Sequence, residues 1–498
     1  MKLRQFPSSN FGVLMPIKKD QMDAFLKSVS QAAKLILECI GEDGFIHVTS
    51  HLDADGLAAA GIIGKALARS GATFRLRVER WMDDEVVDEI AAEEPTLTIF
   101  ADLGGGYLDL LSKKLSDQRV IILDHHEPVG EVSSGLVHVN PHIHGIDGSR
   151  DLSGAGTAYF VAKALNGSNV DLAHLAVVGA LGDIQDKYEQ RSLGGLNKKI
   201  VEDSIDSGYL RVERDLLFFG RETRPIHKAL AYTTTPHIPG ISGQEDKSLA
   251  FLASVGITPK REDKWRALRD LSQDEKKKLS SALSDYLISK GFPSDAALNL
   301  VGTVYTLAHE EPWTPLRDAR EFTVLLNATG RMDRAGVGMA ICMGDRGKAL
   351  DEADEMLDEY RRNIAKYLSW LNEKPDRIEE LSNIYVVRGG GFIDEKMISA
   401  VSTILSTSLP NPEKPLIAYS KVSGEDVAKV SARTLALLTD KGFNLGEILR
   451  VAAEECSGRG GGHDIAAGAQ VPTRNVEPFI KAVDKLVKKQ LEGVRLGG

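Results

Sequence analysis

The chain has few cysteines, few aromatic side chains and no surplus of positive charge, and each shortage argues against a class of protein. Its 498 residues include three cysteines, Cys39, Cys342 and Cys456, which lie far apart and in no metal-binding or redox spacing. This usage fits a reducing cytoplasm and argues against a disulfide framework. Aromatic residues make up 6% of the chain, and the formal net charge is −10. The acidic total disfavours nonspecific duplex binding, and the sparse aromatics disfavour broad base-stacking platforms.

Long hydrophobic runs are also lacking. No apolar run approaches the roughly 18–20 residues of a membrane span, and the first residues, Met1–Pro7, lack the apolar core of a signal peptide. Hydrophobic residues make up 42% and charged residues 27%, the balance of a soluble globular protein. We therefore expect a cytoplasmic protein without membrane association. A length of 498 residues predicts two or three domains.

Apolar runs that resemble buried strands alternate with helical segments between about residues 25 and 185. The runs are rich in Val, Ile, Leu and Phe, and residues 57–69 and 156–165 have a helical pattern. This alternation predicts an α/β fold with a parallel sheet, in which ligands bind beyond the carboxyl ends of the strands. The predicted strands are residues 45–50, 74–79, 97–101, 120–123 and 137–140.

Side chains of the kinds that bind metals follow these runs. Asp124, His125 and His126 come directly after the run 120–123, and three further acidic clusters occupy comparable places. Because the carboxyl ends of parallel strands meet at one edge of a sheet, we expect these groups to converge there. The candidates are His51, Asp53, Asp55, Asp102, Asp124, His125, His126 and Asp183.

Four aspartates and two or three histidines are enough ligands for two divalent ions. Asp53 and Asp55 flank one residue in a turn, so their carboxylates can face neighbouring ions, and Asp102 can bridge ions about 3.5–4 Å apart. Mixed histidine and carboxylate ligation favours manganese, with magnesium, zinc or cobalt as alternatives. Two such ions can generate a hydroxide near neutral pH and neutralise the oxygens of a phosphodiester.

The remaining candidates divide into ligands and supporting groups. His125 and Asp183 can complete one ion and His51 the other, whereas Asp124 is expected to orient His125 through a hydrogen bond. His126 can contact or protonate a phosphoryl group. Each group also has an ordinary alternative. The aspartates can be turn, loop or helix-end residues, the histidines can be structural, and His51 can hydrogen-bond to a ligand instead of binding metal.

Residues 221–315 interrupt the strand–helix alternation and predict a largely helical insertion. Ser272 and Glu275 form a capping-box signature that opens a helix ending near Lys290. Residues 321–327 then return to a strand-like pattern. Apolar side chains recur every three or four residues from 350 to 371, which predicts a long linker helix that stops at Pro375.

A smaller α/β domain is expected after the linker helix. Its predicted strands are residues 384–387, 415–419, 427–432 and 466–471, and its predicted helices are residues 395–406, 445–455 and 476–490. The predicted domains are therefore 25–220 and 316–349 for the parallel-sheet domain, 221–315 for the insertion, 350–375 for the linker helix, and 376–498 for the C-terminal domain.

A glycine-rich run in the C-terminal domain is a candidate phosphate-binding site. Gly460, Gly461 and Gly462 allow backbone N–H groups to approach a phosphate closely, and Arg459 and His463 add charge or hydrogen bonds. The alternative is a flexible turn. Further candidate phosphate contacts, which can equally be surface or salt-bridged arginines and a plain helix N-cap, are Arg331, Arg433 and Ser153.

These residues together resemble the DHH phosphoesterase superfamily. Residues 50–56, Asp102, 124–126 and Asp183 are similar to its four N-terminal motifs in order and spacing, and 460–468 is similar to the motif of its DHH-associated C-terminal domain. Residues 327–332, with the glycines that follow them, resemble the RecJ branch. The length and helical insertion are similar to archaeal RecJ-like nucleases. The resemblance covers most of the chain except residues 244–315.

The resemblance implies an exonuclease for single-stranded DNA or RNA that uses two Mn²⁺ ions, with Mg²⁺ possible and Co²⁺ or Zn²⁺ as lesser alternatives. A nucleic acid strand would run between the parallel-sheet and C-terminal domains. The implied ligands are His51, Asp53, Asp55, Asp102, His125 and Asp183. His126, Asp102 and Asp124 are implied at the reacting phosphate, and Gly461, Gly462 and His463 at an adjacent one. Bacterial RecJ proteins carry an added oligonucleotide-binding domain for which no convincing strand set is present here, which weakens the expectation of long-strand processivity.

Two other functions remain open at this point. One is a hydrolase of short oligonucleotides or cyclic dinucleotides. The other is a replisome scaffold, because eukaryotic replication uses an inactive DHH relative and archaeal relatives bind the GINS complex. The full carboxylate set argues against a purely structural role. DNA replication or repair is the expected process, and a monomer or small homo-oligomer the expected state.

Overall fold

The computed structural model describes residues 17–131, 135–233, 238–291, 300–406, 409–439 and 442–493. The N-terminal stretch used to exclude a signal peptide lies outside these residues. The chain divides into two compact units. The first comprises Met1–His51, Ala58–Tyr188 and Leu193–Ser207, and the second comprises Leu52–Leu57, Glu189–Ser192 and Gly208–Gly498. Among the described residues, no helix is both long and apolar enough to span a bilayer.

A five-stranded sheet with strand order β2-β1-β3-β4-β5 forms the centre of the first unit, and every neighbouring pair is parallel. This confirms the predicted parallel α/β fold. Its inner strands are almost fully buried because they are continuous runs of β-branched and aliphatic residues. The strands are β1 Phe45–His51, β2 Thr73–Glu79, β3 Leu97–Ala101, β4 Arg119–Leu123 and β5 Leu136–Val139.

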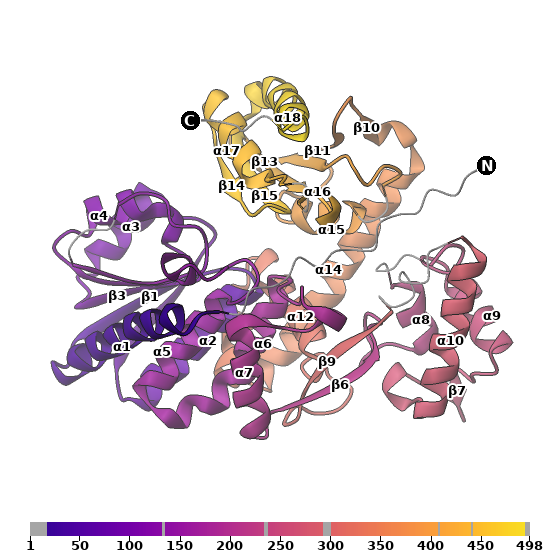
Figure 1. The fold of residues 1–498 in the computed structure, drawn as a ribbon, viewed down its shortest axis with the longest axis horizontal. Helices are drawn as coiled ribbons and strands as arrows, with labels where there is room; N and C mark the ends of the chain where they lie inside the picture. Colours follow the sequence, from indigo (N-terminus) through magenta and orange to yellow (C-terminus); the bar gives the residue numbers. More distant parts are fainter. Residues whose placement is uncertain are drawn as a thin grey trace. The chain divides into compact units, whose positions relative to one another are not determined.

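Helices cover both faces of this sheet. Figure 1 shows α3 and α4 on one face and α1 and α5 on the other. Val87 and Ile90 of α3 and Leu108 and Leu111 of α4 form an apolar core with Phe100 of β3. The helices are α1 Lys19–Gly41, α2 Ala54–Arg69, α3 Asp84–Ala92, α4 Leu108–Lys114, α5 Gly154–Leu165, α6 Ala173–Gly182 and α7 Gly195–Asp206, and the short 3₁₀ turns are η1 Gly105–Tyr107, η2 Pro141–His144 and η3 Gly167–Leu172.

The second unit begins with a long antiparallel pair that encloses the insertion. β6 (Leu210–Leu216) pairs with β9 (Val301–Leu307) along its whole length. The insertion between them is mainly helical, as expected, and α10 begins after Ser272 with the capping box that the sequence indicated. Both β6 and β9 were missed, because each pairs with a strand about 90 residues away in the chain. The insertion contains α8 Ile226–Ala231, α9 Glu245–Ser254, β7 Lys260–Arg261, β8 Lys264–Trp265, η5 Leu268–Asp270 and α10 Gln273–Ser289.

The predicted strand at residues 321–327 is wrong, because this segment belongs to helix α12, Ala319–Arg331. Phe322, Leu325 and Leu326 are buried at helical spacing, and Asp318 caps the helix by accepting hydrogen bonds from the next turn. The short window containing Thr323 and Val324 favoured a strand by composition alone. Two helices follow, α13 Ala335–Met343 and α14 Lys348–Glu373, and α14 confirms the predicted linker helix.

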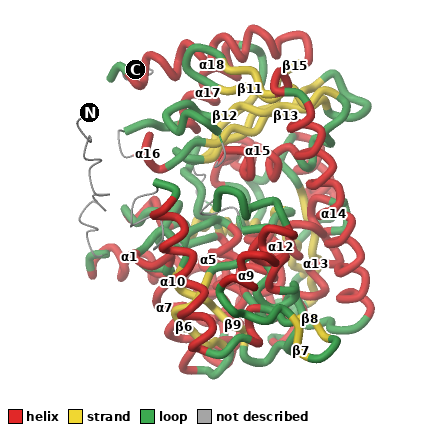
Figure 2. Tube along the Cα trace, turned by 90° about the vertical axis from the view of Figure 1, so that its right-hand side faces the viewer, coloured by secondary structure: helices red, strands yellow, loops and turns green. Residues whose placement is uncertain are grey.

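A six-stranded mixed sheet forms the C-terminal part of the second unit, in the order β10-β11-β12-β13-β15-β14. Figure 2 shows these strands in yellow, with α17 and α18 on one face and α15 on the other. The strands are β10 Ile378–Glu380, β11 Tyr385–Gly390, β12 Leu416–Lys421, β13 Val427–Arg433, β14 Arg459–Gly462 and β15 Ala466–Pro472. The helices are α15 Ile398–Ser406, α16 Ala436–Thr439, α17 Leu445–Glu455 and α18 Val476–Leu491, with 3₁₀ turns η6 Pro375–Arg377 and η7 Thr473–Asn475.

The glycine-rich run forms an edge strand and not the flexible turn that was the alternative to a phosphate-binding site. Gly460, Gly461 and Gly462 lie in β14 and pair with residues of β15. A Cβ atom on Gly460 would lie 2.6 Å from the backbone oxygen of Leu449 in α17. Close helix–strand packing therefore requires at least one of these glycines, independently of any ligand.

Candidate metal centre

Two neighbouring strand ends bring four of the candidate residues together in the first unit. Ala101 at the end of β3 is paired with Leu123 at the end of β4. Asp102 and Asp124 follow directly, and the Asp102 N–H donates to the Leu123 carbonyl at 2.7 Å. The donor atoms of Asp102, Asp124, His125 and His126 all lie within 4.8 Å of one another. The site is thus at the sheet edge where the fold rule places ligands.

The His125 ring is held in a defined orientation. Its Nδ1 atom lies 2.7 Å from the Gly148 carbonyl oxygen, so Nδ1–H donates there and Nε2 faces the carboxylates. Nε2 is 3.0 Å from Oδ2 of Asp183 and 3.3 Å from Oδ1 of Asp102. A histidine with one nitrogen donating to a carbonyl and the other facing carboxylates is arranged as metal-ligating histidines are. Asp183 contributes from the C-terminal end of α6.

The protonation of His125 follows from these neighbours. The ring is fully buried, and burial by itself lowers the pKa of an imidazole. The charges of Asp183 and Asp102 outweigh burial and raise the pKa of His125 well above its ordinary value. A divalent ion at this position must therefore displace a proton.

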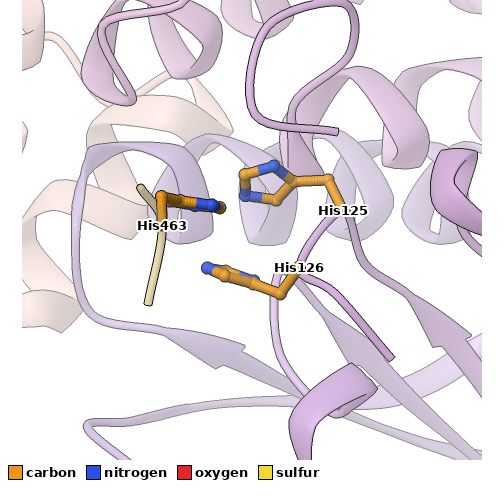
Figure 3. A group of neighbouring side chains, drawn as sticks. All are labelled: His125, His126 and His463. Carbon is orange, nitrogen blue, oxygen red and sulfur yellow. The ribbon is translucent and has the colours of Figure 1, made fainter. Parts of the chain in front are cut away.

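Asp124 organises the turn that carries both histidines. Its Oδ1 accepts hydrogen bonds from the backbone N–H groups of His125 and His126 and lies 2.7 Å from Nδ1 of His126, while Oδ2 accepts from Gly105 N at 2.6 Å. Burial raises the pKa of this carboxyl, but the adjacent His126 and the hydrogen bonds lower it far below the usual range. The expected bond from Asp124 to the His125 ring is replaced by bonds to the His125 backbone and the His126 ring. Figure 3 shows the His125 and His126 rings next to each other. Their centroids are 4.3 Å apart.

Two glycines that were not predicted as part of this centre lie in close contact with its residues. A Cβ atom on Gly154 would lie 2.4 Å from Oδ1 of Asp102, and one on Gly148 would lie 2.0 Å from the His125 carbonyl oxygen. Asp102 itself has a φ of 57°, in the left-handed region that non-glycine residues seldom adopt. The sequence shows that glycines occur near these positions. It does not show that they lie against Asp102 and His125, because that contact depends on the path of the folded backbone.

The other predicted ligands lie at or beyond the end of β1. His51 closes the strand, and its Nδ1 is 3.9 Å from Oδ2 of Asp102, so the structure is compatible with both predicted roles of His51. Asp53 accepts a hydrogen bond from Gly56 N and thereby caps α2, and Asp55 is fully buried in the first turn of that helix. Both belong to the segment Leu52–Leu57, which is counted with the second unit. Their metal-binding roles stay predictions.

Two candidate phosphate contacts are close enough to influence each other within the second unit. Arg331 donates to the Tyr360 hydroxyl at 2.9 Å. Arg433 donates to the hydroxyls of Thr403 and Ser399 and to the Ala432 carbonyl. Burial, together with the charge of Arg331, lowers the pKa of Arg433 to about 10. In the described part of the chain both guanidinium groups contact neutral oxygens and no carboxylate, an arrangement that suits an incoming anion.

The remaining substrate-binding candidates have mixed surroundings. Arg459 is exposed in β14, and Gly461 has open space where a Cβ would stand. His463 lies in the turn after β14, and its N–H donates to the Ala466 carbonyl. Ser153 is buried and its hydroxyl caps α5 by accepting from Gly156 N at 3.1 Å. Capping accounts for Ser153 without a ligand, and phosphate contacts by these residues stay predictions.

Comparison with known proteins gives two family models and several relatives. The DHH-CID domain model matches residues 218–301, and the DHHA1 domain model matches residues 383–489. An uncharacterised protein of Methanocaldococcus jannaschii is 35% identical over 473 residues, which is 94% of this chain and 99% of that protein.

A second relative is the single-stranded-DNA-specific exonuclease RecJ of Thermus thermophilus, which is 27% identical over 192 residues, 36% of this chain and 28% of RecJ. The crystal structure of that RecJ with Mn²⁺ superposes with a TM-score of 0.58 at 19% identity over 93% of this chain and 55% of RecJ. The chain therefore spans little more than half of RecJ. The crystal structure of CDC45 from Entamoeba histolytica superposes with a TM-score of 0.62 at 14% identity, covering 95% of this chain and all of CDC45.

Proposed function

Because this chain belongs to the DHH phosphoesterase superfamily, in its RecJ-like branch, we propose that it is a two-metal phosphodiesterase that degrades single-stranded DNA or RNA from an end. The observation that carries the proposal is the cluster of buried Asp102, Asp124 and His125 with the partly exposed Asp183 at the carboxyl edge of the parallel sheet. Buried carboxylates and imidazoles are costly in free energy unless they are paired or coordinate a cation. Their convergence at the ligand-binding edge supports catalysis over a purely structural role.

The donor set fits a divalent metal that prefers oxygen and imidazole ligands. His125 presents Nε2 to two carboxylates while Nδ1 is bound to a carbonyl, which fixes the tautomer that a metal needs. Mn²⁺ suits this mixture best, Mg²⁺ is the alternative, and Co²⁺ or Zn²⁺ suit it less well. When bound, two such ions would supply a hydroxide near neutral pH and neutralise the phosphodiester oxygens.

The protein's own groups have separable roles in this proposal. Asp102, His125 and Asp183, with His51, Asp53 and Asp55, would hold the metals. Asp124 fixes the turn and the His126 ring, whose side chain is 41% exposed and can contact or protonate a phosphoryl oxygen. Arg331 and Arg433 would bind a flanking phosphate, with support from residues 459–463.

The direct test is digestion of single-stranded DNA and RNA labelled at either end, with Mn²⁺ or Mg²⁺ and with chelator. We expect metal-dependent release of short products from long strands, and the labelled end gives the direction. Cleavage of only two- to five-residue oligonucleotides or of cyclic dinucleotides would replace this proposal with the short-substrate alternative. No metal-dependent cleavage of any of these would contradict a phosphodiesterase.

A second candidate is a structural role in DNA replication, which the CDC45-like fold favours. At 14% identity this likeness concerns the fold alone. Binding to a GINS-type replisomal complex would follow from such a role. A pull-down and a digestion assay on the Asp102→Ala variant together separate the two functions. Retained binding with lost hydrolysis indicates that the protein has both a structural and a catalytic role. Retained binding with retained hydrolysis indicates that Asp102 is not catalytic.

A further inference from the structure

Helix α12 makes two close contacts with the backbone of the segment Leu52–Leu57, which carries Asp53 and Asp55. Oδ1 of Asn327 accepts a hydrogen bond from Ala54 N at 3.2 Å. Gly330, one turn later, lies against the Leu52 carbonyl, where an added Cβ would stand 1.8 Å from the oxygen. The helix and the segment both belong to the second unit. About 270 residues separate them in the chain.

The first contact holds the backbone between the two aspartates. The opening N–H groups of a helix have no partner within the helix, and two of those in α2 find side-chain acceptors from different elements. Oδ1 of Asp53 accepts from Gly56 N at 3.1 Å, and Asn327 accepts from Ala54 N. Asn327 thus supplies a cap that the local sequence does not contain, at the one residue between Asp53 and Asp55.

The second contact sets how closely α12 approaches that segment. No side chain fits at position 330, because the obstacle is a backbone carbonyl and not a flexible side-chain end. α13 supports the same packing, since a Cβ on Gly338 would lie 2.3 Å from the Thr329 hydroxyl and 2.9 Å from the Leu57 side chain. Leu57 ends the segment, so the helices pack against it at both of its ends.

α12 is also anchored at its other end. Glu321, in its first turn, accepts hydrogen bonds from Glu222 N at 2.7 Å and from the Thr223 hydroxyl at 2.6 Å. A helix held at both ends acts as a rigid support for what it contacts. The position of Leu52–Leu57 is therefore determined by α12 as well as by its own chain neighbours.

We infer that Asn327 and Gly330 are positioning residues that hold Asp53 and Asp55 in the geometry a divalent metal requires. The inference rests on the proposed function, in which these two aspartates are metal ligands. Neither Asn327 nor Gly330 touches substrate or metal in this assignment. They act through the backbone of Leu52 and Ala54.

The test is Mn²⁺ binding to the full-length protein, by calorimetry and by loss of the free-ion EPR signal, for Asn327→Ala and Gly330→Ala. Groups that orient metal ligands typically contribute about 10–100-fold to metal affinity, and we expect a loss in that range for at least one of two bound ions. Asn327→Asp keeps the acceptor oxygen and should retain wild-type affinity or better. The matched controls are Asn372→Ala, exposed on α14, and Gly336→Ala, where an added Cβ meets nothing within 4 Å.

The outcomes separate this inference from the proposed function. If the wild-type protein binds no Mn²⁺, the proposed function fails. If it binds two ions and both α12 variants bind them within about twofold of wild type, only the positioning inference fails. Thermal unfolding in chelator shows whether each variant folds. If Gly330→Ala does not fold, Asn327→Ala, which removes the carboxamide and adds no bulk, decides the question alone.

Discussion

Two buried carboxylates, one in each unit, titrate in opposite directions. Asp124 in the first unit is 1% exposed, and Glu321 in the second is 2% exposed. Burial raises the pKa of both, yet the pKa of Asp124 ends far below the usual range, whereas the pKa of Glu321 is raised to about 7. Each accepts several hydrogen bonds, so neither burial nor hydrogen bonding alone explains the difference.

The sign of the neighbouring charge explains it. Asp124 lies against His126 and near His125, which favour its charged form. Glu321 lies near Asp318 and Glu222, which disfavour its charged form. The first unit therefore holds carboxylates and histidines together directly after the ends of β3 and β4. A cation site needs this combination of charged carboxylates and imidazoles. The second holds a carboxyl group whose pKa of about 7 shifts it toward the protonated form, and this group links the insertion to α12. The sign of the neighbouring charge thus holds a buried carboxyl group in its charged form in one region and shifts it toward its protonated form in the other.

The largest expected effect is on catalysis in the first unit. Asp102→Ala should lower kcat at least about 100-fold while the protein stays folded, because this carboxylate would hold the divalent ions that stabilise charge on the reacting phosphate. Single-turnover digestion with saturating Mn²⁺ measures the effect. Asp117→Ala, at an exposed position, is the control. Residual activity within about tenfold of wild type would rule out a bridging role for Asp102.

The next effect concerns stability in the second unit. Since the pKa of Glu321 rises from 4.5 to about 7, the native state holds an extra proton between these values. The contribution of Glu321 to stability should therefore be complete below pH 4.5 and fall as the pH rises from 4.5 through 7, by an amount on the order of 3 kcal/mol. Glu321→Gln should abolish this fall while keeping the acceptor for Glu222 N. Urea unfolding at several pH values measures it, with exposed Glu355→Gln as control. An unchanged slope in Glu321→Gln would contradict the assignment.

The third effect concerns metal affinity and pH. Because the carboxylates raise the pKa of His125, a metal competes with a proton for the ring. Affinity for Mn²⁺ should fall about tenfold for each pH unit below that pKa. Calorimetric titrations in buffers of different ionisation enthalpy also count the proton released. Mn²⁺ binding that neither weakens at low pH nor releases a proton would show that His125 is not a metal ligand.

The smallest expected effect concerns phosphate binding by Arg433 in the second unit. Arg433→Gln should raise KM for single-stranded substrate about five- to tenfold with little change in kcat, because a phosphate contact outside the reacting centre contributes ground-state binding. Steady-state kinetics at two salt concentrations measure it, with exposed Arg474→Gln as the matched control. A pure loss of kcat would place Arg433 at the reacting phosphate instead.

Local sequence signals predicted much of the fold. Five apolar runs marked the strands of the parallel sheet, and the Ser272–Glu275 capping box marked the start of α10. Prediction failed where distant residues decide local structure. β6 and β9 depend on pairing with each other, and residues 321–327 form a helix whose buried face packs against other elements. The Asp318 cap of this helix was a local signal that the strand prediction overlooked. The glycines of β14 form a strand because they pair with β15, and the lack of a side chain on Gly460 lets α17 pack closely on it.

The sequence by itself determined which residue types could form the candidate centre and that they follow consecutive strands, because side-chain chemistry and strand periodicity are local properties. Only the tertiary structure decided that Gly148 orients His125, that Asp124 binds the His126 ring, and that α12 supports the segment between Asp53 and Asp55. These contacts join residues on separate elements or depend on the exact path of a turn. Their distances depend on how whole strands and helices pack, which no short stretch of sequence specifies.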